Sequence, residues 1–170
     1  ELRVLKRDGK PTNSVSRMWV FCSGAYSEKQ MALYQYHPTR SSAVVREVIG
    51  DYSGYLQTDG YSAYNAAEKA THIGCWAHAR RKFVDCLPKG IDDKNSKAAK
   101  ALDIIGRLFS IEQGLKGMPE GEIRAARTEK SVPLLNKYWE LLQTVSAPGG
   151  SKLYQAVNYS LNHKTQLEGY

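Results

Sequence analysis

Residues 55–60, YLQTDG, and residues 71–75, THIGC, are the two stretches that decide the predicted fold. Each joins β-favouring residues to a turn or helix signal at its end, so we expect two strands. The first strand ends at Asp59 and Gly60, and a short helix is expected between the strands over residues 63–69. A further helix is predicted from about Ala77 to Cys86. This part of the chain is therefore expected to form a βαβ unit followed by a helix.

Upstream of this unit the sequence predicts three consecutive strands joined by short loops. Pro38 ends the third strand, and Ser41 or Ser42 can cap a helix that carries apolar residues at helical spacing up to Ile49. The order of elements is then βββαβαβα, and the predicted fold class is α/β. The three strands are expected at residues 2–5, 18–21 and 31–36.

Downstream of residue 91 the chain is predicted to be almost entirely helical. Pro119 is expected to start one helix, and Pro133 to kink or divide the stretch 120–145, because proline cannot donate to the preceding turn. Residues 147–150, APGG, form a linker, and one last amphipathic helix is expected after it. We therefore divide the chain into residues 1–91, the α/β part, and residues 92–170, the helical part.

The composition is that of an ordinary globular domain, with 42% hydrophobic and 24% charged residues among 170. This excludes wholesale disorder and a coiled-coil rod. No apolar stretch approaches the roughly 18 to 20 residues of a membrane span, and no secretory signal is visible. Three cysteines do not suggest a disulfide framework. We expect a soluble protein of the reducing cytoplasm.

The net charge of +7 favours a polyanionic partner, and nucleic acid is the main candidate. The basic residues concentrate between positions 69 and 89, where Asp85 is the only acid. The triplet Arg80, Arg81 and Lys82 lies on the predicted helix of this stretch and is a candidate phosphate contact. The alternative is an ordinary solvated helix face.

Asp59 is the first candidate for chemistry. A carboxylate at the carboxyl end of a sheet strand lies at a mouth of the fold, where oxygen ligands can hold a hard cation such as Mg²⁺. The alternative is an ordinary turn, since Asp-Gly is a common turn dipeptide. Tyrosines surround Asp59 in sequence, and a half-buried shell is favoured over stacking on extruded bases. These tyrosines are Tyr52, Tyr55, Tyr61 and Tyr64.

Cys75 and His78 are three residues apart at the predicted junction of strand and helix. Such a pair can supply two zinc ligands, whereas a structural zinc site needs about four. In the alternative, Cys75 packs as a small hydrophobe, Trp76 anchors the core and His78 makes local hydrogen bonds. His37 and His163 stand alone in polar surroundings, and the sequence assigns them no role.

Four longer segments carry a resemblance to a known family. The segments GYLQTDGYSAYN at 54–65 and HIGCWAHARRKF at 72–83 closely resemble the core of bacterial transposases of insertion-sequence family sixty-six. The segments KSVPLLNKYWELLQ at 130–143 and LYQAVNYSLNH at 153–163 resemble the downstream helical region of that family. With the opening LRVL and the MWV of residues 18–20, the resemblance spans essentially the whole chain.

The resemblance implies a ribonuclease H-like catalytic domain, in which three antiparallel strands and a βαβ unit form one mixed sheet. In that family two Asp and one Glu bind two divalent cations, Mg²⁺ or Mn²⁺. Asp59 matches the second acid. The register places the first acid just ahead of Glu1 and the third beyond Tyr170, so the resemblance implies a central fragment that is inactive alone. Residues 92–170 then correspond to the helical insertion between the second and third acids.

The resemblance further implies a DDE-type transposase, a polynucleotidyl transferase that cuts transposon ends and transfers strands by two-metal phosphoryl transfer. Its partners are expected to be double-stranded DNA, as transposon ends and target, and further copies of the protein, at the nucleoid in the cytoplasm. Arg80, Arg81 and Lys82 are expected to contact phosphate, and the pair Cys75 and His78 has no assigned role. The alternatives are a non-catalytic nucleic-acid-binding domain derived from a transposase and, less favoured, a small zinc-binding interaction module.

Overall fold

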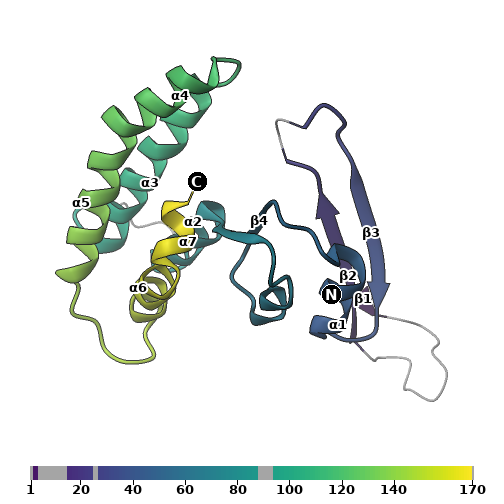
Figure 1. The fold of residues 1–170 in the computed structure, drawn as a ribbon. Coiled ribbons are helices and arrows are strands. Elements are labelled where there is room, and N and C mark those ends of the chain that lie inside the picture. The colour runs from purple at the N-terminus through teal and green to yellow at the C-terminus, as the bar shows by residue number, and fades with distance from the viewer. Residues whose placement is uncertain (1, 4–14, 25–26, 88–93, 170) are drawn as a thin grey trace. The chain divides into compact units, whose positions relative to one another are not determined.

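The computed structural model describes residues 2–3, 15–24, 27–87 and 94–169, which divide into two compact units (Figure 1). The first unit comprises Glu1–Gly54 and Tyr61–Ala70, and the second comprises Tyr55–Gly60 and Thr71–Tyr170. Both helices and strands are present, as predicted for an α/β chain. None of the helices in the described ranges is long and apolar enough to cross a membrane.

The first unit is built on an antiparallel sheet in the order β1 (Leu2–Arg3), β2 (Val15–Cys22) and β3 (Ala32–His37). Its alternation is clear on β2, where Trp19 is buried and Met18 and Val20 on either side of it are exposed. The three predicted strands are confirmed, although the end of the first one, residues 4–5, lies outside the described residues.

Helix α1 (Ser42–Ile49) follows β3 in the first unit. The Ser41 side chain accepts a hydrogen bond from the Ala43 N–H at 3.2 Å, so Ser41 is the N-cap. Val44 and Val45 are fully buried, and the helix ends at Gly50. The predicted cap and helix are confirmed.

The short helix predicted at 63–69 is present as a 3₁₀ helix, η1 (Ser62–Ala66), rather than as the α-helix of the expected βαβ unit, and it ends earlier than predicted. The amide of Tyr64 donates to the Tyr61 carbonyl, and the amide of Ala67 donates to the Tyr64 carbonyl, which is 3₁₀ spacing. Ala67 then leaves the helical region, with φ −85° and ψ 67°, and is buried. The small residues Ala63, Ala67 and Ala70 are buried along this segment.

The second unit begins with β4 (Tyr55–Thr58) and β5 (Thr71–Gly74), which pair in parallel, followed by α2 (Trp76–Val84). The parallel direction of the two strands, which the predicted βαβ unit requires, is confirmed. The connection between them contains a 3₁₀ helix in place of the α-helix. In the part of the chain that the structure describes, the strands form two separate sheets, one antiparallel and one parallel. The single mixed sheet expected from the sequence is therefore not seen as such.

The rest of the second unit is helical, as predicted. A π-helical segment directly precedes α5, and Pro133 occupies the first turn of α5, where its missing N–H costs least. The predicted division at this proline is confirmed. The predicted single last helix is instead two helices that meet at His163. The helices are α3 (Lys97–Gly114), α4 (Glu120–Ala126), η2 (Arg127–Ser131), α5 (Val132–Gln143), α6 (Lys152–Asn162) and α7 (Lys164–Glu168).

An aromatic core joins these helices to α2. Trp76 and Tyr138 meet edge to face at 5.2 Å between ring centroids, and the Trp76 Nε1–H donates to the Leu167 carbonyl at 2.8 Å. The Tyr138 hydroxyl forms a buried hydrogen bond with Ser160 Oγ at 2.7 Å. Helices α3 and α5 run side by side (Figure 1). Trp76 is therefore the core anchor that the sequence suggested.

Gly74 at the end of β5 permits a close approach of α7. A Cβ added to Gly74 would lie 3.0 Å from the Leu167 side chain and from its backbone nitrogen. A backbone atom at that distance cannot move aside cheaply, so a larger residue would push α7 away from the strand pair. The strand pair, α2 and the last two helices consequently form one packed body within the second unit.

Candidate active site

Asp59 and Cys75 directly follow the two parallel strands. The last paired residues of β4 and β5 are Thr58 and Gly74, so both side chains leave the same end of the strand pair. Asp59 is half-buried. This is the mouth position expected from the sequence for a carboxylate that binds a hard cation.

Tyr159 of α6 contacts the main chain of Asp59. Its hydroxyl donates to the Asp59 carbonyl oxygen at 2.9 Å across 100 residues of sequence. Burial, with smaller contributions from the negative charges of Asp59 and Cys75, raises the pKa of Tyr159 to about 12. The hydroxyl therefore keeps its proton at neutral pH and can serve as a stable donor.

His163, at the junction of α6 and α7, contacts both Tyr159 and Gly60. Its ring stacks on Tyr159 with centroids 4.5 Å apart, and its Nδ1 is 2.8 Å from the Tyr159 carbonyl oxygen. Because a carbonyl only accepts, Nδ1 carries the proton in this hydrogen bond. The Nε2 side of the ring lies against Gly60, where an added Cβ would overlap it.

The basic triplet on α2 does not present one uniform face. Arg80 and Arg81 are exposed, whereas Lys82 is half-buried with its Nζ 4.9 Å from the ring centroid of Tyr159. Lys82 thus lies beside the residue that contacts Asp59, and the two arginines remain available to solvent. Of the other basic residues of this stretch, Lys69 pairs with Asp51 at 2.8 Å, and Lys89 lies outside the described residues.

Cys75 and His78 occupy the start of α2. Cys75 is the N-cap residue without a side-chain capping bond, and His78 Nδ1 is buried with no hydrogen-bond partner. The local hydrogen bond suggested for His78 is therefore not found at this nitrogen. Among the described residues, no group of three or more His, Cys, Asp or Glu side chains is placed to hold a metal ion. The described residues therefore provide neither a zinc site at Cys75 and His78 nor a complete magnesium site at Asp59.

Asp59 fits one part of a magnesium site, because its carboxylate is a hard oxygen donor at an accessible strand end. A pair of divalent cations needs further carboxylates. Within the described ranges no such set surrounds Asp59, so this stretch alone does not make a complete metal centre.

The tyrosines near Asp59 in sequence have different environments. In the first unit, Tyr61 and Tyr64 are half-buried and meet edge to face at 6.4 Å, and Tyr61 lies under the Arg40 guanidinium at 3.9 Å. Their half-burial agrees with the prediction for these two tyrosines. Tyr52 and Tyr55 are exposed, at 49% and 72%, and for these two the expected half-buried shell is wrong.

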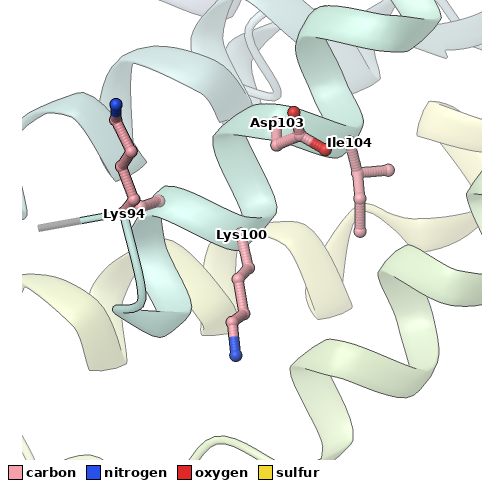
Figure 2. A pocket seen from close by; sticks show the side chains of 5 residues that line it. Lys94, Lys100, Asp103 and Ile104 are labelled. Carbon is pink, nitrogen blue, oxygen red and sulfur yellow. The ribbon is translucent and has the colours of Figure 1, made fainter.

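The larger of the two hollows described lies at the start of α3 and contains none of the predicted site residues. Its volume is about 570 Å³, and it is lined by Lys94, Ala99, Lys100, Asp103 and Ile104. Figure 2 shows the ammonium groups of Lys94 and Lys100 pointing in opposite directions. The polar groups therefore do not converge on one point, as a ligand site requires.

Tyr159 and His163 are the site residues that the sequence did not reveal. Their spacing of four on an amphipathic helix places both on one face, which is the one local signal that they act together. No local signal links them to a residue 100 positions earlier.

Comparisons with known proteins identify the family of the chain. The model of the Transposase IS66 family matches residues 1–170. Two relatives from Sinorhizobium fredii, the uncharacterized proteins y4qI and y4jD, are 30% identical over 150 residues and 28% identical over 152 residues. These alignments cover 82% and 81% of this chain but 28% of each relative, so the chain spans less than a third of their length. No solved structure matches the chain. With its whole length matched, the chain belongs to the IS66 family of transposases.

Proposed function

We propose that this chain is part of the catalytic domain of a DDE-type transposase, which cuts transposon ends and joins them to target DNA. The observation that carries the proposal is Asp59, half-buried at the carboxyl end of β4 in a strand pair whose motifs match the family. An antiparallel sheet of three strands followed by a parallel pair supports a ribonuclease H-like fold, with residues 1–91 as its core and residues 92–170 as a helical insertion.

Asp59 acts in this proposal as one carboxylate ligand of two Mg²⁺ or Mn²⁺ ions, and the full-length protein supplies the remaining acids. When bound, such ions activate the attacking hydroxyl or water and stabilise the leaving oxygen. The residues of this chain orient the carboxylate and hold the DNA. Since the described residues bring no metal-binding set to Asp59, we expect the 170-residue chain alone to leave DNA uncut.

Arg80 and Arg81 are proposed to contact the phosphates of double-stranded DNA, because both are exposed on the helix that follows β5. Lys82 is proposed to contact phosphate closer to Asp59. The partners are then transposon ends, target DNA and further copies of the protein, and the protein works at the nucleoid.

The test is cleavage and joining of transposon-end DNA by the full-length protein with Mg²⁺, compared with its Asp59→Asn variant. We expect cleavage to fall by at least about 100-fold while DNA binding is kept, because even residues that only orient a metal ligand contribute about 10- to 100-fold. Asp103→Asn, the same change at an exposed carboxylate on α3, is the control and should keep full activity.

Two results would contradict the proposal. Equal cleavage by the wild type and Asp59→Asn would remove Asp59 from the active site. DNA binding without cleavage in either protein would instead favour a non-catalytic nucleic-acid-binding domain derived from a transposase.

A further inference from the structure

The main chain of Asp59 is held from outside the strand pair by α6. The Tyr159 hydroxyl donates to the Asp59 carbonyl oxygen at 2.9 Å, and both groups belong to the second unit. A hydrogen bond to the carbonyl of a site residue restricts rotation of the adjoining peptide, and this peptide sets the direction in which the carboxylate leaves the backbone.

Tyr159 is itself held by three contacts. The His163 ring stacks on the Tyr159 ring with centroids 4.5 Å apart, and the Lys82 Nζ lies 4.9 Å from the centroid of the same ring. The Tyr159 carbonyl accepts the His163 Nδ1–H at 2.8 Å. Helix α6 is anchored behind it by Ala156 and Ser160, which are fully buried. The donor is therefore on a rigid element, which a positioning group requires.

The turn after Asp59 is contacted on its next residue as well. Gly60 has φ +80°, its N–H donates to Thr58 Oγ1 at 3.2 Å, and the His163 ring fills the space where a side chain would project. Two consecutive residues, Asp59 and Gly60, are thus fixed by two residues of the last helices, Tyr159 and His163.

We propose that Tyr159, supported by His163, is a positioning residue for the Asp59 carboxylate. The helices after residue 150 would then belong to the active-site framework, in addition to any role as an insertion. The inference rests on the proposed function of Asp59 as a metal ligand. A displacement of a catalytic group by about 1 Å can cost about 100-fold in rate, so a hydrogen bond that fixes its backbone has a measurable consequence.

The test compares Tyr159→Phe, which removes only the hydroxyl, with the matched control Tyr138→Phe. Tyr138 loses a hydrogen bond of similar length, to Ser160 in the core, and donates no described hydrogen bond to Asp59. The first readout is NMR of the 170-residue chain, using the carbonyl ¹³C shift of Asp59 and amide hydrogen exchange of Gly60. The second is the Mg²⁺ concentration for half-maximal cleavage by the full-length protein, with affinity for end DNA measured alongside.

In Tyr159→Phe we expect a changed Asp59 carbonyl shift and about three- to tenfold faster exchange at Gly60, the range that loss of one hydrogen bond produces. The half-maximal Mg²⁺ concentration should rise by about tenfold, with DNA affinity unchanged. His163→Gln should act in the same direction, which provides a second variant if the first folds poorly. Tyr138→Phe should lower the melting temperature without these changes.

A wild-type carbonyl shift, exchange rate and Mg²⁺ dependence in Tyr159→Phe would overturn the inference, as would equal changes in Tyr138→Phe. The failure of the proposed function is distinguishable, because it appears as cleavage that survives Asp59→Asn. In that case the NMR readout would show whether Tyr159 orders the turn, and the positioning role for a metal ligand would be rejected.

Discussion

At the residue scale, Gly60 is constrained in two independent ways. Its φ of +80° lies in the region that disfavours side chains, and the His163 ring occupies the place of its missing Cβ. Asp-Gly dipeptides are common in ordinary turns. The packing of His163 is what distinguishes this one.

Replacing Gly60 with alanine therefore adds two costs. The positive φ costs about 1 to 2 kcal/mol, and displacement of His163 adds about 1 to 3 kcal/mol. Gly117→Ala is the matched control, because Gly117 has the same φ of +80° and open space around it. Urea unfolding should show Gly60→Ala to be the more destabilised variant, and equal losses would mean that His163 does not press on Gly60.

Tyr159 predicts a loss of stability at alkaline pH. Its pKa is about 12 in the folded chain against 10.0 for an ordinary tyrosine, so folding favours the protonated hydroxyl. A pKa raised by folding gives a contribution that is complete below pH 10 and is lost as the pH rises through 10 to 12. Burial also raises the pKa of Tyr138, which contributes in the same direction.

The measurement is the free energy of unfolding in urea at pH 9, 10 and 11. We expect it to decline for the wild type and to decline less for Tyr159→Phe, since phenylalanine has no proton to lose. Parallel declines in the two proteins would show that the Tyr159 hydroxyl is not shielded from solvent in the folded chain.

At the element scale, α2 has one face in the core and carries its basic triplet in two environments. Trp76, Ala79 and Phe83 are buried, Lys82 lies on Tyr159, and Arg80 and Arg81 are exposed. Helical geometry separates consecutive residues by about 100°, so three adjacent residues cannot share one face. We therefore expect the two arginines to account for most of the DNA contact of this helix.

The expected result is a weaker dependence of the affinity for DNA on salt concentration. Each phosphate contact contributes about 0.9 to the slope of log affinity against log salt, so Arg80→Ala with Arg81→Ala should reduce the slope by about 2 in full-length protein. Arg107→Ala with Lys116→Ala removes the same charge at two exposed positions, one on α3 and one just after it. This control pair should leave the slope nearly unchanged. If both pairs give the wild-type slope, the triplet is a solvated face.

Elements differ in how well the sequence predicts them. Helix α1 was predictable because its cap, Ser41, and its apolar spacing are local. The 3₁₀ form of η1 was not, because alanine has a high α-helix propensity and the local sequence carries no signal for the tighter helix. The break between α6 and α7 also escaped prediction, since no proline or glycine marks it and His163 itself ends α6.

At the scale of the whole molecule, the last two helices complete the second unit. Leu167 provides the acceptor for Trp76, Ser160 binds Tyr138, and Val157 is buried in the same core. A truncation at residue 150 would leave two buried polar groups without partners and expose this apolar surface.

We expect removal of residues 151–170 to cost the second unit about 5 kcal/mol, from two large apolar side chains and two hydrogen bonds. The check is loss of the near-ultraviolet circular dichroism of its tryptophans and of the cooperative urea transition. Serine at the exposed residues Tyr154 and Leu161 of α6 should leave both signals in place. A truncated chain with an unchanged transition would show that these helices are not part of the core.

The sequence by itself determined what depends on neighbouring residues. These features are the strand that directly precedes Asp59, the capped helix at Ser41, the division of the helical stretch at Pro133 and the motifs that resemble the family. Periodicity, caps and turn dipeptides are local, so they can be read along the chain. The tertiary structure alone decided that Tyr159 and His163 hold Asp59 and Gly60, and that Lys82 lies on the Tyr159 ring. These contacts join segments about 80 to 100 residues apart, and they exist because the shared core docks α6 beside α2 and the end of the strand pair.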